Sequence, residues 1–326
     1  MVGQEQMVAG DGISKQKLLL AAGIAVVAVA GLVLLPGGSN SAGAITQVPA
    51  GVDTVVRLDL TITSDRLTQF SAVVNGAPLG GADNATAAFE NETGIDPGPA
   101  REVVVFSDNR SANESAYRGL VLHPNAETDT AVDGVQDTTN GSYQSTTYNG
   151  QTVYAPANAP NRYIGVLGEG QLVVGTQAAV RDTIDVHAGD ADSLEGPLRQ
   201  AYENTDNGTV RFATSAPERW VPSDSGGFLN TEAYRKLDTA SGTYYIDGGD
   251  AGLTLQLGAS SAPNAQTVKQ ATEGATVIGQ RTIANESVAA ALDSVNVTRE
   301  GETVTVRYEQ PLGAFQRTVR YLYGEF

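Results

Sequence analysis

Residues 143–154 read YQSTTYNGQTVY, and this stretch decides the class of fold. Two runs rich in aromatic and hydroxyl-bearing residues, 143–148 and 151–154, are separated only by Asn149-Gly150. An Asn-Gly pair suits a two-residue turn in which both residues take a positive φ, which is typical of a tight β-hairpin. The sequence therefore predicts two antiparallel strands joined by this turn.

Strand and helix signals alternate on both sides of this hairpin. Alternating or short apolar runs bounded by turn residues predict further strands, which are expected at 53–63, 102–106, 117–122, 162–167, 171–174, 210–213, 243–246, 253–257 and 303–308. Apolar residues at helical spacing predict helices, which are expected after Ser64 and Asp65 and at 127–136, 177–187, 227–237, 264–278, 286–295 and from 311 onward.

The order strand, helix, hairpin, helix, hairpin occurs twice along the chain. The last hairpins of the two rounds also resemble each other locally, because residues 150–153 read GQTV and residues 301–304 read GETV. This pattern indicates an internal duplication. We expect an α+β fold with two similar subdomains, 48–208 and 209–326, each an antiparallel sheet with helices packed on one face.

A transmembrane helix is expected near the N-terminus. Residues 18–35, from Leu18 to Leu35, read LLLAAGIAVVAVAGLVLL without a charged side chain. At about 1.5 Å per residue this segment spans roughly 27 Å, close to the hydrocarbon thickness of a bilayer. Lys15 and Lys17 precede it, so the positive-inside rule places residues 1–17 in the cytoplasm and exports the chain after Pro36. Residues 36–47 are rich in glycine and serine and are expected to form a flexible linker.

A cleaved signal peptide is the alternative interpretation of this segment. Ala42-Gly43-Ala44 offers an A-x-A pattern for cleavage. The apolar run is longer than the roughly 7–15 residues of a typical signal-peptide core. Both interpretations export the body of the chain, and the absence of cysteine excludes a lipoprotein anchor.

The charge balance excludes several classes of protein. Lys and Arg number 20 against 37 Asp and Glu, which gives a net charge of −17, and this negative surface disfavours nucleic acid as a partner. The chain has no cysteine and two histidines, which excludes thiol chemistry and histidine-rich metal centres. Dispersed acidity with scarce lysine resembles secreted and membrane-anchored proteins of halophilic archaea, with ordinary acidic solubility as the alternative.

Asn-x-Ser/Thr sequons indicate N-glycosylation of an exported body. All follow the apolar segment. The candidate acceptors are Asn84, Asn91, Asn109, Asn113, Asn140, Asn207 and Asn285. An eighth sequon begins at Asn296, at the head of an expected strand where attachment is sterically poor.

Motifs for catalysis and metal binding are missing. There is no Gly-x-Ser-x-Gly elbow and no P-loop, and Gly165, Gly168 and Gly170 lie between two strands, where a dinucleotide site does not form. Aspartates repeat at four-residue spacing from Asp129, which favours a solvated helix face over a metal site. No catalytic, metal-binding or cofactor-binding residue is therefore assigned.

Three single residues have a structural and a functional interpretation. His187 falls in the last turn of an expected helix, where a donor or cation suits the helix dipole. His123 precedes Pro124 at a strand end, and either histidine could act as an acid or base only beside a suitable partner. Trp220, in the sequence PERWVP, either packs against the sheet or contacts a partner protein.

Short motifs carry a resemblance to a family. The entry Val48-Pro49-Ala50, the strand that follows it, and the segment LVVGT at 172–176 with its following helix resemble prokaryotic membrane-anchored extracytoplasmic proteins of unknown function. The resemblance covers about half of the chain. It implies an N-terminal anchor and an exported α+β body, and it implies no catalytic residue.

The sequence thus predicts a single-pass, surface-exposed membrane protein of non-enzymatic interaction or envelope role in a high-salt organism, without cofactors and with a protein partner at the cell surface. Two alternatives stay open. One is an extracytoplasmic module that binds a solute or divalent cation through carboxylates, and the other is an exported hydrolase with an unfamiliar site.

Overall fold

The computed structural model describes residues 43–59, 100–108, 117–124, 127–137, 142–157, 162–168, 170–220, 231–247, 249–282 and 285–322. The strands are β1 (Thr54–Asp59), β2 (Ala100–Asp108), β3 (Tyr117–Pro124), β4 (Tyr143–Tyr148), β5 (Gln151–Pro156), β6 (Tyr163–Gly168), β7 (Gln171–Gly175), β8 (Val210–Thr214), β9 (Leu237–Asp247), β10 (Asp250–Ala259), β11 (Asn296–Glu300) and β12 (Thr303–Pro311). The helices are η1 (Ala44–Gln47), α5 (Thr128–Asp137), α6 (Gln177–Ala188), α7 (Gly196–Glu203), η2 (Pro217–Trp220), α8 (Thr231–Tyr234), α9 (Ala262–Thr282), α10 (Glu286–Asp293) and α11 (Leu312–Leu322).

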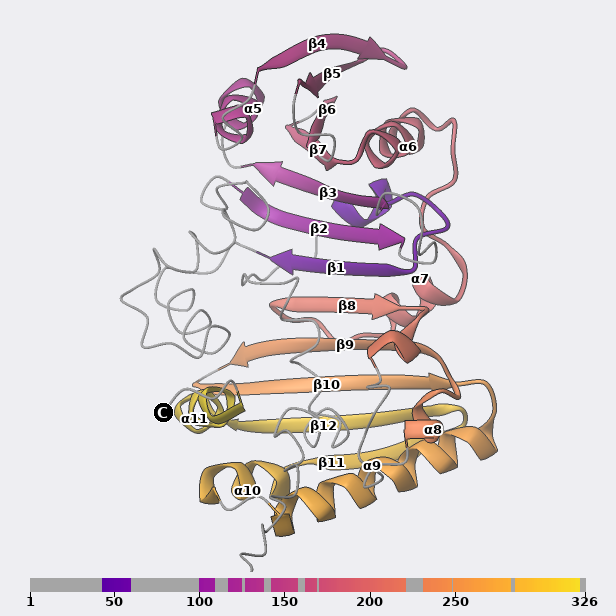
Figure 1. The fold of residues 1–326 in the computed structure, drawn as a ribbon, viewed down its shortest axis with the longest axis vertical. Helices are drawn as coiled ribbons and strands as arrows, with labels where there is room; N and C mark the ends of the chain where they lie inside the picture. The colour runs from indigo at the N-terminus through magenta and orange to yellow at the C-terminus, as the bar shows by residue number, and fades with distance from the viewer. Residues whose placement is uncertain are drawn as a thin grey trace, which may run out of the picture.

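All twelve of these strands belong to one antiparallel sheet, in the order β11-β12-β10-β9-β8-β1-β2-β3-β7-β6-β5-β4 (Figure 1). An α+β protein built on antiparallel pairing is therefore confirmed. The expected separate sheets of two subdomains are not: strands β1–β7 and β8–β12 occupy the two halves of a single sheet. The halves join where β1 pairs with β8, with Val56 opposite Phe212.

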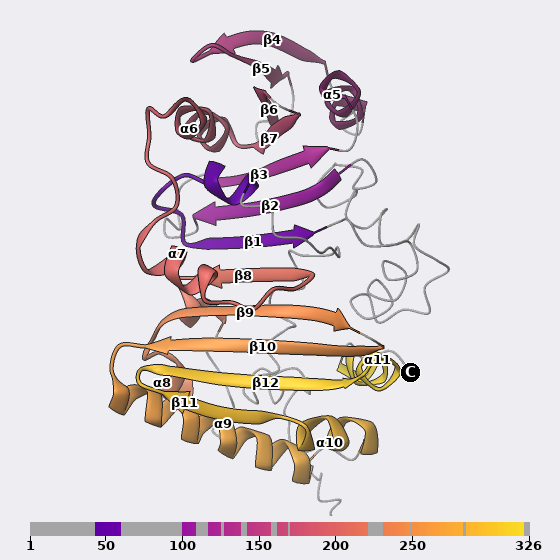
Figure 2. The same ribbon diagram turned by 180° about the vertical axis from the view of Figure 1, so that it is seen from behind.

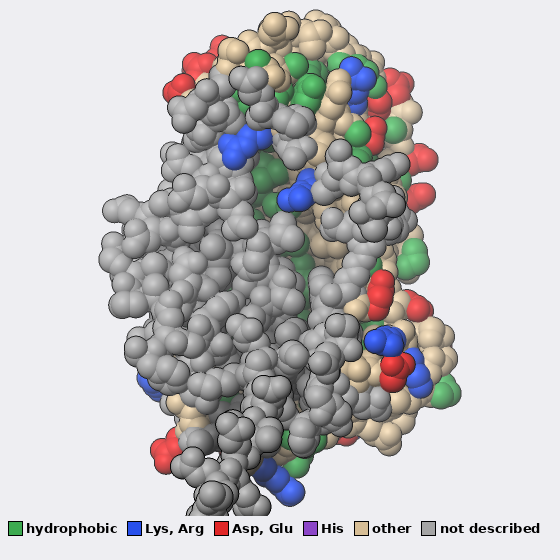
Figure 3. Space-filling view, in the orientation of Figure 1, with side chains coloured by type: hydrophobic (Ala, Val, Ile, Leu, Met, Phe, Trp, Pro, Cys, Tyr) green, Lys and Arg blue, Asp and Glu red, His purple; other side chains and the backbone are tan. Residues whose placement is uncertain are grey.

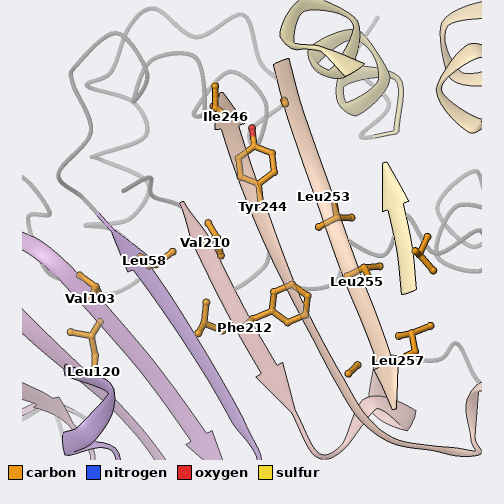
Figure 4. Packing of buried hydrophobic residues seen from close by; sticks show 14 of the residues in the cluster. Leu58, Val103, Leu120, Val210, Phe212, Tyr244, Ile246, Leu253, Leu255 and Leu257 are labelled. Carbon is orange, nitrogen blue, oxygen red and sulfur yellow. The ribbon is translucent and has the colours of Figure 1, made fainter. Parts of the chain in front are cut away.

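Helices cover both faces of the sheet. The sequence had predicted helices on one face only. On the first face, a hydrophobic cluster extends across both halves and includes residues of α5, α9, α10 and α11. Figure 4 shows part of this cluster, with Leu58 of β1 close to Val210 of β8. On the second face, a smaller cluster packs the strands of the first half against η1, α6 and α7. Figure 1 shows α5 and α6 flanking β6 and β7 on opposite sides.

Local sequence signals explain the turns and helix ends. Asn149 and Gly150 have φ values of 45° and 78°, so the two-residue turn between β4 and β5 is confirmed. Helix α6 begins after Thr176, whose side chain accepts a hydrogen bond from the N–H of Ala179, and ends at Gly189 with φ of 80°. The strands expected on either side of residues 247–250 pair as a hairpin, and the last hairpin, with its turn at residues 300–303, also forms.

Two expectations are corrected by packing. The linker was expected to extend to residue 47, but Ala44–Gln47 form η1, and Ala44 and Ile45 are buried in the second-face cluster. The helix expected at 227–237 is limited, within the described residues, to Thr231–Tyr234, because β9 already begins at Leu237. In addition, α7 forms at Gly196–Glu203, where no helix was predicted.

Some sequence-based expectations lie outside the described residues. These include the apolar segment from Leu18 to Leu35 and the helix after Ser64. Among the helices of the described part, none combines the length and apolarity needed to cross a membrane.

Candidate functional site

Four polar side chains form a row across four neighbouring strands on the second face of the sheet. Asp59 of β1 lies opposite Glu102 of β2, and Glu102 lies opposite His123 of β3. Gln171 of β7 continues the row through a contact between its Nε2 and Nε2 of His123. Directly opposite residues of antiparallel strands have Cβ atoms about 4.5–5.5 Å apart, so the register brings these groups together. We call Asp59, Glu102, His123 and Gln171 the polar row.

Arg57 forms ion pairs with both carboxylates of the polar row. Its side chain lies on the same face as that of Asp59, two residues later in β1. The Arg57 Nε donates to Oε1 of Glu102 at 2.5 Å, and its Nη2 lies 3.4 Å from Oδ2 of Asp59. Asp59 and Glu102 are 1% and 3% exposed, so neither carboxylate is exposed to bulk water. Two carboxylates buried this deeply are stable only when a cation lies within ion-pair distance of them.

The pKa values follow from this arrangement. Burial by itself raises the pKa of Glu102, but the hydrogen bonds from His123 and Arg57, together with their charges, outweigh burial and hold the pKa below its ordinary value. Burial lowers the pKa of Arg57, but the hydrogen bond to Glu102 and the nearby negative charges raise it above its ordinary value. Both groups are therefore ionised at neutral pH.

His123 is engaged at both ring nitrogens. Its Nδ1 lies 3.2 Å from Oε2 of Glu102, and its Nε2 faces the amide nitrogen of Gln171. The carboxylate of Glu102 can only accept, so Nδ1 of His123 donates its proton to Oε2 of Glu102. The backbone of Gly43 covers the ring edge, since a Cβ at Gly43 would lie 2.7 Å from Cε1 of His123.

A second arginine lies beside this group. Arg211 of β8 is directly opposite Arg57. Its Nε donates to Oγ1 of Thr205 at 2.8 Å and its Nη2 to the carbonyl oxygen of Tyr202 at 2.9 Å, while its guanidinium lies 4.5 Å from the centre of the Tyr202 ring. The Tyr202 hydroxyl is buried and has no hydrogen-bond partner among the described atoms. Burial raises the pKa of this hydroxyl, and the charges of Arg211 and Arg57 reduce the shift.

The described side-chain contacts of the polar row join its members to one another and to Arg57. A buried carboxylate that orients a histidine is half of a hydrolytic triad, which also needs a hydroxyl or thiol beside the free ring nitrogen. In the described structure that position is occupied by Gln171. The hydrolase alternative needs a serine and a carboxylate beside His123 or His187, and the hydrogen bonds described for the His123 ring join it to Glu102 and Gln171.

The candidate glycosylation sites are distributed over the chain. Asn84, Asn91, Asn109, Asn113 and Asn140 lie outside the described residues. Asn207 is exposed in the segment between α7 and β8. Asn285 caps α10, because its Oδ1 accepts a hydrogen bond from the N–H of Val288 at 3.2 Å. Asn296, expected to be a poor acceptor, is exposed at the start of β11.

The other residues discussed from the sequence lie away from the polar row. Trp220 ends η2, which contacts β9. Asp129, Asp133 and Asp137 lie on the exposed side of α5, as expected of a solvated face. His187 lies in the last turn of α6. None of these joins the polar row.

Sequence reasoning missed the polar row except for His123. Arg57 and Asp59 alternate with apolar residues in β1, a pattern typical of a strand with one solvated face. Their burial follows from the central position of β1 between β2 and β8, with helices on both faces. The sequence did contain one signal for this site, because Arg57 and Asp59, with opposite charges, lie two residues apart on the same face of a predicted strand.

Comparisons with known proteins give a distant structural similarity. No protein-family model matches the chain, and no curated protein matches it. Among solved structures, crystal form III of TP0453 is 12% identical, covers 86% of this chain and 99% of its own, and gives a TM-score of 0.49. Crystal form I of TP0453 is 14% identical, covers 88% of this chain and 100% of its own, and gives a TM-score of 0.47.

Proposed function

We propose that the protein is a single-pass membrane protein whose exported body acts at the cell surface through contacts with other proteins or the cell envelope, without catalysis. The observation that carries the proposal is the uncharged apolar segment from Leu18 to Leu35, followed closely by a folded body. A segment of this length and composition partitions into a bilayer as a helix. The two lysines before it favour a cytoplasmic N-terminus.

The start of the body limits its distance from the membrane. Because η1 begins at Ala44, only residues 36–43 separate the apolar segment from the fold. Eight residues reach at most about 26–29 Å when fully extended. The body would therefore stay within one protein diameter of the bilayer, a position that suits contacts with the envelope or with neighbouring membrane proteins.

The polar row supports a non-catalytic role. The groups best suited to acid–base chemistry, Glu102 and His123, bind each other and Arg57 or Gln171. They hold the centre of the sheet together. A high-salt environment is part of the proposal, because a net charge of −17 repels itself in dilute buffer, and at about 1 M salt the screening length falls to roughly 3 Å.

Protease treatment of intact cells tests the topology. The full chain carries a C-terminal epitope, and its membrane fraction is also extracted with alkaline carbonate. We expect the epitope to be lost to external protease and the intact protein to stay in the carbonate-resistant membrane. The control Val27→Arg places a charge at the centre of the segment, costs about 2.5–3.5 kcal/mol of insertion free energy, and should shift protein into the extractable fraction.

Two results would contradict the proposal. A body protected from external protease would refute the orientation. A mature protein that lacks residues 1–44 by mass spectrometry and leaves the membrane in carbonate would support the signal-peptide interpretation instead.

A role in binding divalent cations is the alternative from sequence. Within the described part of the chain, no group of three or more acidic or histidine side chains is placed to hold a metal ion. Calorimetry with calcium and magnesium at high salt tests this alternative, which a saturable heat signal would revive.

A further inference from the structure

The two edges of the sheet differ in how they are protected. At one edge, α9 runs along β11 in both views of the ribbon (Figures 1 and 2), and β11 carries Arg299 and Glu300. At the other edge, Gln144, Ser145 and Thr146 of β4 are exposed on both faces, and no described helix or strand lies beyond them. Natural proteins normally protect an edge strand with charges, proline or a covering element. Edge strand β4 has none of these among its described residues.

The surroundings of β4 are also uncharged. Residues 138–161 contain no Asp, Glu, Lys or Arg. Charged residues make up 17% of the chain, so 24 residues would carry about four on average (24 × 0.17). Figure 3 shows the top of the molecule, over β4, largely in the colour of uncharged polar side chains and backbone. In a chain of net charge −17, two copies can approach here without bringing carboxylates together on the paired strands.

The register identifies which backbone groups face outward. Tyr148 and Gln151 flank the two-residue turn and form a hydrogen-bonded pair, and hydrogen-bonded pairs then alternate along the hairpin. The N–H of Ala157 donates to the carbonyl of Ser142 at 2.9 Å, which agrees with this alternation. Ser145 and Thr147 therefore direct their backbone N–H and C=O groups away from β5.

We propose that two copies of this chain associate by pairing β4 with β4, antiparallel, about a two-fold axis at Ser145. In an antiparallel pair of identical strands, the two-fold axis perpendicular to the sheet lies midway between two directly opposite residues. The residue at the axis therefore lies opposite the same residue of the second copy. Centred at Ser145, the pairing places each Ser145 opposite Ser145 of the second copy and Gln144 opposite its Thr146. The reciprocal backbone bonds form at the outward-facing residue, and all facing side chains of these pairs are neutral hydrogen-bonding groups.

Salt should strengthen this association. Asp185 and Asp190 lie near the turn of the hairpin, where both accept hydrogen bonds from Asn149. Their charges and the remaining negative charge of each copy oppose dimer formation in dilute buffer. At about 1 M salt the screening length of roughly 3 Å removes most of this repulsion. The inference is independent of the membrane anchor, because it concerns only the folded body.

Single-cysteine variants of the full chain in mild detergent test the pairing and its register. The chain has no cysteine of its own, so each variant carries one. In the proposed dimer, Ser145→Cys places two thiols on a hydrogen-bonded pair with Cα atoms about 5.5 Å apart, within disulfide range. Thr147→Cys, also at an exposed position of the same strand, places its two thiols four residues apart along the strands, about 13 Å. Thr298→Cys on β11 is the matched control at the other edge.

We expect Ser145→Cys to form a disulfide-linked dimer on mild oxidation at least about tenfold faster than the other two variants. Sedimentation of the unmodified chain should show a dimer whose fraction rises with salt concentration. Ser145→Lys should weaken the dimer about tenfold or more, because two like charges would face each other, whereas Thr298→Lys should not. Equal rates for the three cysteine variants, or a monomer at all concentrations and salts, would overturn the proposal. A dimer in which Thr147→Cys links fastest would also overturn it, because the register would be different. Circular dichroism checks that each variant is folded.

Discussion

Replacing Glu102 by glutamine should reveal how much the polar row stabilises the fold. The substitution keeps the size of the side chain and removes its charge. Arg57 would lose its contact with the carboxylate at 2.5 Å and keep Asp59 at 3.4 Å. Removing one partner of a buried ion pair costs about 3–5 kcal/mol. Because Asp59 still neutralises Arg57, we expect the free energy of unfolding to fall by the lower end of this range, about 3 kcal/mol.

The pH dependence gives this prediction a distinctive sign. The pKa of Glu102 in the folded protein lies below its ordinary value of 4.5. A carboxyl whose folded pKa is lowered contributes its full stabilisation above the unfolded pKa and loses it as the pH falls through the folded pKa. The difference in stability between the unmodified chain and Glu102→Gln should therefore be constant near pH 7 and should shrink as the pH falls below 4.5.

Urea denaturation followed by circular dichroism, at pH 7 and at several values below 4.5, measures this difference at a fixed high salt concentration. Glu273→Gln is the matched control, since Glu273 is 46% exposed and pairs with Lys269 on the surface of α9. Its effect should stay within about 0.5 kcal/mol. A loss below about 1 kcal/mol for Glu102→Gln at pH 7, or a loss that does not change with pH, would refute the reasoning about the polar row.

Two further predictions concern packing. Gly119→Ala should destabilise the protein by about 2–4 kcal/mol in urea titrations, because the new Cβ would lie 2.0 Å from Cζ of the buried Phe106. The control is Gly134→Ala on α5, whose new Cβ would meet no atom within 4 Å, and it should raise stability by about 0.5–1 kcal/mol. Tyr202→Phe should raise the unfolding free energy by about 1 kcal/mol, because it removes a buried hydroxyl without a partner in the described structure and keeps the ring under Arg211; a loss larger than that in thermal unfolding would show that the hydroxyl is bonded.

Local signals predicted those parts of the fold that depend on a few consecutive residues. The turn at Asn149-Gly150 forms because these two residues tolerate positive φ, and α6 begins and ends where Thr176 and Gly189 supply caps. The short helix η1 was not predicted, because its residues carry no helix signal of their own. It is held in place by the burial of Ala44 and Ile45. Its position depends on α6 and on strands distant in sequence.

The candidate site could not be found from sequence because it depends on strand register. Asp59, Glu102 and Gln171 are separated by tens of residues and become neighbours only when β1, β2, β3 and β7 pair in one register. A shift of one residue in any of these strands would turn its polar side chain to the other face. His123 was noted as a single residue, and its partners were not.

The amino-acid sequence by itself determined the turns, the helix caps, the alternation of strands and the negative charge of this protein, since each depends on backbone preferences or composition within a short stretch. The tertiary structure alone decided that the two halves share one sheet, that Arg57 and its carboxylates are buried, and that β4 is the end strand of the described sheet. The physical reason is that pairing between β1 and β8 and burial on both faces are long-range interactions, whose free energy depends on which strands lie side by side.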